Sequence, residues 1–353
     1  MAAGMPLAQT PTVAEDIART LEQTREDWEE LRGGRMLITG GTGFFGRWLL
    51  SSFAVIEQQL RLGAEAVVLT RDADAFHRSM PALAQAPNIR LIQGDVADFP
   101  FPDGSFTHAI HAASELSHAQ PTPAFDLMAH SIDSGRHVLE FCRRSGVRKL
   151  LYTSSGAVYG PPVPGRDALA EDDALSPLPL RGSSAYAGAK RSLELMAAMW
   201  GQQHGIEVRI VRGFAFLGPF LPLDSPLAAT GFLQAALLGR DIVIQGHGQT
   251  VRSYLYGGDL ATWLWRILFR GQRDRPYNLG SDARVTIAQL AASIAAQSDS
   301  PIAVRIMGTR DPTQPLDVYV PDISRARREL ALDVFTPLNE AIRRTLRHHR
   351  EAH

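Results

Sequence analysis

The chain reads Met36-Leu37-Ile38-Thr39-Gly40-Gly41-Thr42-Gly43-Phe44-Phe45-Gly46 over the stretch that decides its fold. The apolar run 36–38 predicts a short buried strand, and the apolar run that begins at Trp48 predicts a helix. A glycine turn between a strand and a helix is typical of a site that binds a dinucleotide. A plain glycine turn in an α/β protein is the alternative interpretation.

The three glycines of this turn have separate expected roles. Gly40 permits the tight turn, Gly43 lets the backbone approach a pyrophosphate, and Gly46 lets the helix pack closely on the strand. Free N–H groups at the start of the helix, at Phe44 and Phe45, are expected to face the phosphates. The spacing is G-x-x-G-x-x-G instead of G-x-G-x-x-G, which makes the turn alone a moderate signal.

The composition excludes several classes of protein. The chain has 353 residues, of which 45% are hydrophobic, and a net charge of -1, so a full core is expected and nucleic acid is not expected as a partner. Cys142 is the only cysteine, which predicts neither disulfides nor a thiolate metal site, and no metal is expected. We see no membrane span and no signal peptide, and expect a cytoplasmic protein. The basic stretch 343–350 is interpreted as the solvated end of a helix.

Strand and helix patterns alternate along the first two thirds of the chain. This alternation predicts an α/β fold of the Rossmann type, a doubly wound parallel sheet with a smaller C-terminal substrate domain. We expect a dinucleotide-binding domain over 35–212, joined by part of 250–280, and a mainly substrate-binding domain over 213–353. Residues 1–34 form a helical extension, with a helix over 13–32 capped at Thr12. Its apolar stripe is expected to cover its own chain or a second subunit.

Residues that follow the second strand decide which dinucleotide binds. Thr70 and Arg71 suit a 2′-phosphate, which favours NADP over NAD, although Asp72 could still reach a ribose hydroxyl. Asp95 follows the third strand and is expected to accept from the adenine amino group, with Val96 against the ring. The alternatives are a surface arginine at 71 and a plain turn residue at 95.

Residues near the ends of the fourth and fifth strands are also candidates for the site. Ala112 is small and leaves room for the cofactor, whereas His111 is interpreted as structural. Tyr186 and Lys190 are four residues apart and so share a helix face. The lysine cation is expected to lower the pKa of the tyrosine. Ser155 can hydrogen-bond the reacting oxygen, so these three residues permit proton removal as hydride leaves.

At this point the chain resembles the extended short-chain dehydrogenase/reductase family, which includes nucleotide-sugar epimerases and dehydratases. The resemblance covers roughly residues 35–330. The residues that carry it are the turn 39–46, Gly94-Asp95-Val96, His111-Ala112-Ala113, Ser154-Ser155, Val158-Tyr159-Gly160, Tyr186, Lys190, Arg212, Gly218-Pro219, Gly246, Gly248, Arg252 to Tyr256, Asp259 and Tyr277 to Gly280.

The resemblance implies a role for each matching residue. Ser155 would position the oxygen, Tyr186 would be the base, and Lys190 would activate it and hold the nicotinamide ribose. The implied substrate is a sugar attached to a nucleoside diphosphate. Arg252 falls where the family places a diphosphate-binding arginine, and a salt-bridged surface arginine is the alternative.

Three departures from the family pattern affect the substrate and the reaction. The family's 4,6-dehydratases carry Asp-Glu after the active-site Ser/Thr, whereas this chain has Gly156-Ala157, so simple dehydration is disfavoured. Ala215 replaces an asparagine and lies between Phe214 and Phe216, which are expected to give the substrate site an apolar wall. Ser131 replaces a second asparagine. The exact sugar therefore stays open.

Two reactions fit these residues best. The first is epimerisation, at C4, by transient oxidation of a ring hydroxyl and return of the hydride to the opposite face. The second is reduction of a 4-keto nucleotide sugar by NADPH. Dehydration or decarboxylation of a nucleotide sugar is a third option. A non-catalytic nucleotide-binding scaffold is the alternative from another class, and the intact Ser155, Tyr186 and Lys190 argue against it. A homodimer is expected.

Overall fold

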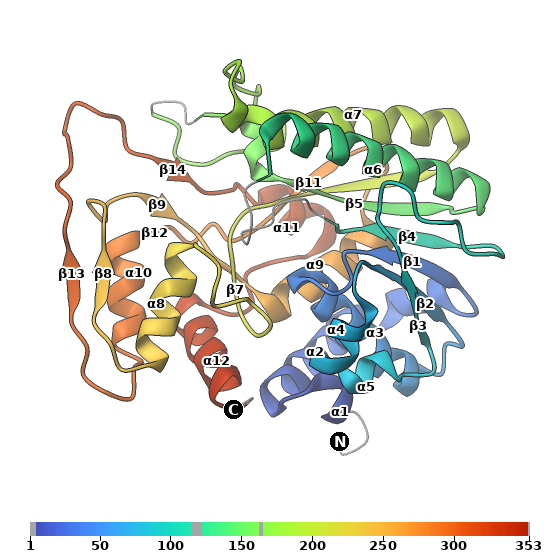
Figure 1. Cartoon of the computed structure of the whole chain (residues 1–353), viewed down its shortest axis with the longest axis horizontal. Coiled ribbons are helices and arrows are strands. Elements are labelled where there is room, and N and C mark those ends of the chain that lie inside the picture. Colours follow the sequence, from blue (N-terminus) through green and yellow to red (C-terminus); the bar gives the residue numbers. More distant parts are fainter. Residues whose placement is uncertain (1–4, 114–121, 162–164, 352–353) are drawn as a thin grey trace.

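The computed structural model describes residues 5–113, 122–161 and 165–351. At its centre seven strands form a sheet in the order β11-β6-β5-β4-β1-β2-β3, and every neighbouring pair is parallel (Figure 1). The strands are β1 (Arg35–Thr39), β2 (Glu65–Thr70), β3 (Ile89–Gln93), β4 (His108–His111), β5 (Lys149–Ser155), β6 (Glu207–Gly213) and β11 (Pro276–Leu279). The predicted doubly wound α/β fold is confirmed.

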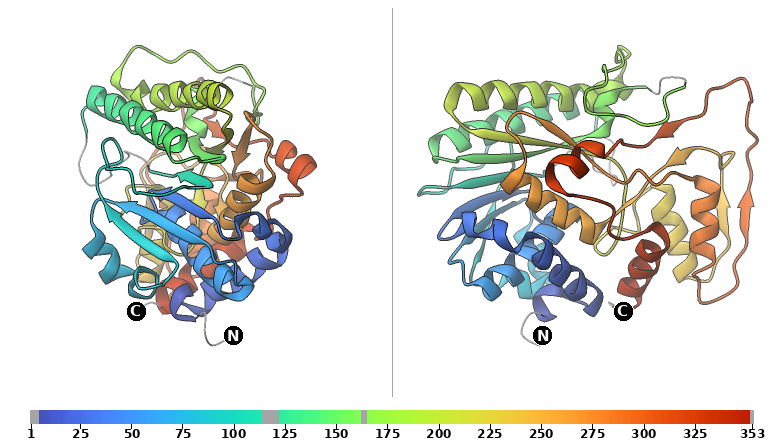
Figure 2. Two further views of the ribbon diagram at one scale, coloured as in Figure 1. Left: turned by 90° about the vertical axis from the view of Figure 1, so that its right-hand side faces the viewer. Right: turned by 180° about the vertical axis from the view of Figure 1, so that it is seen from behind.

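Helices cover both faces of this sheet (Figure 2). Helices α6 (Ala124–Arg144) and α7 (Ala185–His204) lie on one face, and α3 (Phe44–Leu60) and α9 (Gly257–Arg270) lie on the other. Because side chains alternate along a strand, β1 supplies both apolar cores, which explains its unbroken hydrophobic run. The short helices α4 (Ala73–Ser79) and α5 (Pro81–Ala84) connect β2 to β3.

The C-terminal part of the chain builds a smaller body beside the carboxyl ends of the strands (Figure 1). An apolar core joins its helices to its short strands. Its elements are β7 (Phe216–Leu217), α8 (Ala228–Leu237), β8 (Ile242–Ile244), β9 (Val251–Arg252), β10 (Leu255–Tyr256), β12 (Val285–Thr286), α10 (Ile287–Ala295), β13 (Val304–Ile306), β14 (Val318–Tyr319) and α12 (Leu338–Glu351). The intervening α9, β11 and α11 (Ser324–Leu330) belong instead to the layers of the central sheet.

Helix α9 is buried along most of its length. Trp263 and Trp265 are fully inaccessible to solvent and lie in the same core as α3. The indole N–H of Trp265 donates to Ser52 at 2.8 Å, and that of Trp263 donates to the carbonyl of Asp333 at 3.0 Å. Both tryptophans are therefore core residues. Among the described residues, no helix combines the length and the apolar character that a membrane span needs.

The N-terminal extension differs from its prediction at both ends. The helix α2 begins earlier, as Pro11–Thr24, and its cap is Thr10, whose Oγ accepts from the Val13 N–H. Proline suits the first helical position because its φ is already helical and it has no N–H to satisfy, so Thr10 becomes the cap in place of Thr12. The expected last two turns form a 3₁₀ helix, η2 (Arg25–Leu31). The extension packs on α3, α9 and α12 of its own chain.

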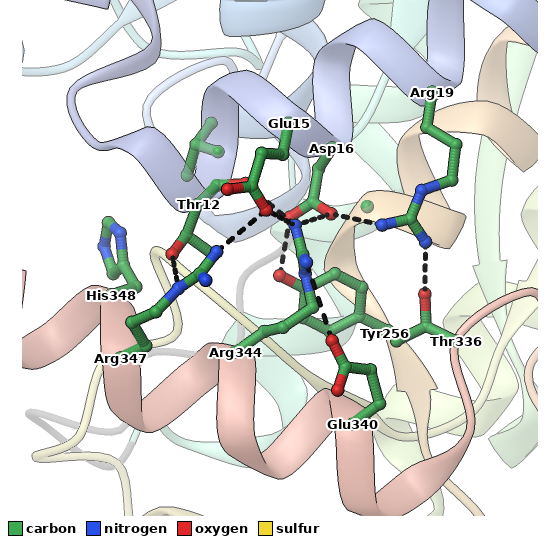
Figure 3. A network of polar contacts seen from close by, with 12 residues as sticks. Thr12, Glu15, Asp16, Arg19, Tyr256, Thr336, Glu340, Arg344, Arg347 and His348 are labelled. Carbon is green, nitrogen blue, oxygen red and sulfur yellow. Dashed lines mark hydrogen bonds and ion pairs between the residues drawn. The ribbon is translucent and has the colours of Figure 1, made fainter.

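The prediction that the basic stretch 343–350 is the solvated end of a helix was wrong for Arg344, although Arg343 and Arg350 are exposed. Arg344 of α12 is buried and pairs with Asp16 of α2 at 2.8 Å (Figure 3). The Tyr256 hydroxyl donates to the same carboxylate at 2.6 Å, and Arg344 also donates to the carbonyl of Thr12 at 3.1 Å. A buried carboxylate at the far end of the chain neutralises this arginine, a pairing that local sequence patterns do not reveal.

We expect Arg344→Met to destabilise the protein by about 3–5 kcal/mol, because the variant leaves the buried Asp16 carboxylate with only the longer ion pair to Arg19, at 3.5 Å. The measurement is the urea midpoint of unfolding. Arg343→Met is the matched control, because Arg343 pairs with Glu340 on the exposed face of the same helix. That variant should cost less than about 1 kcal/mol. Equal losses of stability in the two variants would show that the buried ion pair between α2 and α12 contributes no more than an exposed one.

Candidate active site

The glycine turn brings backbone into contact with backbone. Gly40 has φ +71°, and a Cβ on it would lie 2.5 Å from the backbone of Ala112. A Cβ on Gly46 would lie 2.3 Å from the backbone of Gly41. Gly43 differs, because the nearest atom to its Cβ position is the carbonyl oxygen of Gly40 at 3.5 Å. The first and third glycines therefore serve packing, and Gly43 leaves open space.

That open space is a crevice of about 510 Å³ along the carboxyl ends of the strands. Most of the predicted cofactor residues line it, namely Gly40, Gly43, Phe44, Phe45, Arg71, Asp95, Val96, Ala112 and Lys190. Gly46 does not line the crevice and acts through its contact with Gly41. The first turn of α3 presents N–H groups to the crevice, which fits the pyrophosphate of a dinucleotide. The residues present therefore suit a nicotinamide dinucleotide.

The two acids expected near the adenosine are partly engaged within the protein. Asp72 caps α4, where its Oδ1 accepts from the Ala75 N–H at 2.8 Å. Oδ1 of Asp95 accepts from the Ala97 N–H at 2.9 Å and lies 3.3 Å from the His130 ring. Arg71 is exposed at the crevice and forms no ion pair with any described residue. This leaves its guanidinium able to meet an anion.

The three predicted catalytic residues line the same crevice. Lys190 is buried, its Nζ donates to the carbonyl of Thr153 at 2.9 Å, and it lies 5.9 Å from the centroid of the Tyr186 ring. Ser155 is the last residue of β5 and caps the 3₁₀ helix η3 (Gly156–Tyr159), accepting from the Ala157 N–H at 3.2 Å. One turn of α7 and the end of β5 thus bring a phenol, an ammonium and a hydroxyl together.

His111 also lies close to this group but is held as a structural residue. Its Nδ1 lies 2.7 Å from the Thr39 hydroxyl, which joins β4 to β1. Burial, together with the charge of Lys190, lowers the pKa of His111 to about 3. The ring is therefore neutral at physiological pH and cannot serve as a proton donor there. This agrees with the structural interpretation of His111.

A second cavity, of about 890 Å³, adjoins the crevice and lies in the smaller body. Phe214 and Phe216 line both spaces, and Arg252 lines the second. The side chain of Arg252 is about three quarters buried and pairs with Asp317 at 2.7 Å. Arg252 is therefore salt-bridged and also lines the cavity, and its role in binding a diphosphate stays a prediction. A bound diphosphate would compete with Asp317 for this arginine.

Two features of the site were missed by reasoning from the sequence. Tyr319 lines the second cavity, its ring stacks on Phe214 at 4.6 Å, and its hydroxyl lies beside Gly156, 2.3 Å from the place that a Cβ would take there. It reaches this position only through the pairing of β14 with β9, so no local pattern marks it. The second feature is the buried ion pair of Arg212 with Glu194, at 2.8 Å, which joins β6 to the helix that carries Tyr186. Arg212 belongs to the family pattern, but that pattern gives no partner for it.

The chain has clear similarity to known proteins. A sequence model of the NAD dependent epimerase/dehydratase family matches residues 36–280. Among curated proteins, the chain is similar to UDP-glucuronic acid decarboxylase 6 of Arabidopsis thaliana. The two are 26% identical over 310 residues, which cover 87% of this chain and 86% of the relative.

Two solved structures illustrate the shared fold. One is UDP-N-acetylglucosamine 4-epimerase from Methanobrevibacter ruminantium M1 in complex with UDP-N-acetylmuramic acid, with a TM-score of 0.76 and 21% identity over 91% of this chain and 99% of that one. The other is a variant of UDP-glucuronic acid 4-epimerase from Bacillus cereus in complex with UDP-4-deoxy-4-fluoro-glucuronic acid and NAD. Its TM-score is 0.75, with 19% identity over 90% of this chain and 100% of that one.

We expect Gly43→Ala to lose affinity for the cofactor and Gly46→Ala to lose stability. The methyl group in Gly43→Ala meets only open space in an extended backbone conformation, so the thermal midpoint should change little while the affinity for NAD⁺ falls about tenfold or more. The methyl group in Gly46→Ala meets backbone, so the thermal midpoint itself should fall. Calorimetry of unfolding and of NAD⁺ binding measures both. Unchanged NAD⁺ affinity in Gly43→Ala would place the pyrophosphate elsewhere.

Proposed function

The chain belongs to the NAD-dependent epimerase/dehydratase family, and we propose on this basis that it epimerises a nucleoside-diphosphate sugar, at C4. The observation that carries the proposal is that Ser155, Tyr186 and Lys190 line one crevice with the glycine turn. Binding alone needs no such group of proton-transfer residues, which argues against a scaffold. Next to the serine, Gly156 and Ala157 offer no acid or base for eliminating water.

The residues of this chain would share the work of proton transfer. A bound nicotinamide dinucleotide supplies the acceptor and donor of hydride. The Lys190 ammonium would stabilise the phenolate form of Tyr186, which would take the proton of the sugar hydroxyl and become a phenol. Ser155 would donate a hydrogen bond to the same sugar oxygen and hold it in place as it becomes a ketone. The Tyr186 phenol would give the proton back to this oxygen when the ketone is reduced from the other face of the ring, which gives the epimer with no net consumption of cofactor.

The second cavity would hold the rest of the substrate. Phe214 and Phe216 stand between the two spaces, where they would border the sugar, and Arg252 would meet the diphosphate. The sugar and the base of the nucleotide are not assigned by these contacts. The names of the similar proteins point to uridine diphosphate sugars as the first probes.

Two further observations concern the cofactor preference and the oligomeric state. Arg71 is exposed at the crevice and has no anionic partner among the described residues, which favours NADP and hence the alternative of a 4-keto sugar reductase that consumes NADPH. Exposed apolar side chains on α6 and α7, Phe125, Leu195 and Met199, support the proposed homodimer through these helices. Light scattering of Leu195→Glu tests the dimer, which should become a monomer.

Product analysis separates the possible reactions. The purified protein is incubated with UDP-glucose and with UDP-glucuronic acid, without added nicotinamide, and the products are followed by mass spectrometry and chromatography. We expect an isomer of unchanged mass. Loss of carbon dioxide would instead identify a decarboxylase, and loss of water would identify a dehydratase. In a separate incubation with NADPH and a 4-keto nucleotide sugar, consumption of NADPH would identify a reductase. Any of these three results would overturn the epimerase.

We expect Tyr186→Phe to abolish turnover while cofactor binding stays nearly intact, because the variant removes the proton acceptor and keeps the ring. Activity on UDP-sugars and the affinity for NAD⁺ are measured side by side. Tyr152→Phe is the control, because Tyr152 is buried beside Lys190 and lies outside the residues that line the crevice. Full activity in Tyr186→Phe would refute its role as the base.

Cofactor preference is tested at Arg71. If its guanidinium binds a 2′-phosphate, Arg71→Ala should weaken NADP⁺ binding about tenfold, the scale of one charge-assisted hydrogen bond, and leave NAD⁺ binding nearly unchanged. Titration calorimetry with each dinucleotide gives both affinities. Equal affinities for NADP⁺ in the variant and the parent would remove the support for NADP.

A further inference from the structure

A further cavity, of about 760 Å³, adjoins the cofactor crevice at the glycine turn. Thr42, Gly43 and Phe44 line both spaces. The rest of its lining comes from the N-terminal extension, the segment 79–83, the loop 220–223 and the end of α12. No catalytic residue and no residue expected to bind the sugar is among the described residues that line it. Its size is that of a site for a small molecule.

Arg47 brings a positive charge to this cavity. It lies in the first turn of α3, where its Nε donates to the carbonyl of Thr42 at 3.1 Å and its Nη2 donates to Ser79 Oγ at 3.3 Å. Both acceptors are uncharged, and Arg47 forms no ion pair with a carboxylate in the parts of the chain that the structure describes. Burial lowers the pKa of Arg47, because a cation away from water is costly without an anion. An anionic ligand would offset this cost.

Two other ionisable groups at the cavity are neutral or engaged elsewhere. The carboxylate of Glu351 accepts from the Thr12 hydroxyl at 3.1 Å and lies 3.6 Å from the Arg347 side chain. Nδ1 of His348 lies 3.0 Å from the Thr10 hydroxyl, and burial together with the charge of His349 lowers the pKa of His348 to about 4. His348 is therefore neutral at physiological pH. The potential near Arg47 is positive, and the start of α3 adds to it.

Apolar side chains form much of the remaining lining. Phe220 is held between two rings, with its centroid 5.3 Å from that of Trp48 and 5.4 Å from that of His348. The other large apolar residues of the lining are Met80, Leu83, Leu221 and Leu223. A cavity that combines such walls with one charged group suits a ligand that has an apolar body and a single ionic group.

We propose that this cavity is a second ligand site, which binds a small organic anion through a phosphate or carboxylate group on Arg47 and an apolar body against the loop 220–223. The ligand would lie across the segment 42–44 from the pyrophosphate of the cofactor. Because like charges repel and Arg47 also holds the Thr42 carbonyl, the ligand should weaken binding of the cofactor. The site is thus regulatory, and it does not depend on which sugar reaction the enzyme catalyses.

The first test measures binding to the full chain by titration calorimetry. Phenyl phosphate and benzoate combine an oxyanion with an apolar body, whereas inorganic phosphate and benzyl alcohol each carry one half. We expect at least one of the two aromatic anions to bind at about 1 mM or tighter, the scale for a ligand of this size, and the two halves to bind at least about tenfold more weakly. The tighter anion identifies the oxyanion. Binding of neither anion, or equal binding of a half, would overturn the proposal.

Variants locate the bound anion. Arg47→Met should weaken its binding about tenfold or more, the scale of a charge-assisted hydrogen bond, and Arg47→Lys should fall between this variant and the parent. Arg71→Met and Arg252→Met are matched controls, because each removes a guanidinium from one of the other two spaces. Ala82→Trp fills the cavity, keeps Arg47 and should also weaken binding. An unchanged affinity in Arg47→Met and Ala82→Trp, or an equal loss in a control, would contradict the assignment.

The last test measures the coupling between the two ligands. With rising concentrations of the tighter anion, the apparent Kd for NAD⁺ should rise roughly fivefold and then stay constant, as two ligands that bind together and repel require. The effect should be lost in Arg47→Met. A Kd that rises without limit would place the probe in the cofactor crevice, and an unchanged Kd would exclude regulation. These titrations use no sugar, so their outcome is separate from that of the proposed epimerase, and binding of the anion is decided even if NAD⁺ does not bind.

Discussion

Close backbone contact at the glycine turn is the constraint on which the rest of this structure depends. Gly40 lies against the backbone of Ala112, and Gly46 lies against Gly41, at separations that admit no Cβ. These contacts bring the start of α3 to the carboxyl ends of β1 and β4. They leave N–H groups facing an open crevice, the arrangement a dinucleotide needs. A side chain at either glycine would move the helix and close the space.

Buried polar groups then place the reactive residues around that crevice. The Lys190 ammonium bonds to Thr153 on β5, and the pair of Arg212 and Glu194 ties the same helix to β6. The Tyr159 hydroxyl links this pair to Asn278 on β11. Burying such charges costs desolvation free energy, so the ion pair contributes more by fixing one arrangement of the helix and the strand than by stabilising the fold. Here they define where α7 sits, and hence where Tyr186 faces.

The smaller body is joined to the sheet by side chains as well as by chain connections. Tyr319 and Phe214 stack on each other beside Gly156, at the boundary between the two cavities. Away from the crevice, Asp16 binds Arg344 and Tyr256, so the N-terminal extension holds the last helix in place (Figure 3). Contacts between segments far apart in the chain therefore fix both the site and the helices around it.

The amino-acid sequence alone determined the fold class, the alternation of strands and helices as far as β5, and the candidates Ser155, Tyr186 and Lys190. These follow from local patterns: apolar runs, glycines with a required spacing, and two residues one helical turn apart. It did not reveal the cap at Thr10, the burial of Arg344, the Asp317 partner of Arg252, or Tyr319. Only the tertiary structure decided these, because each depends on a partner far away in the chain, and such a partner leaves no periodic trace in the residues around it.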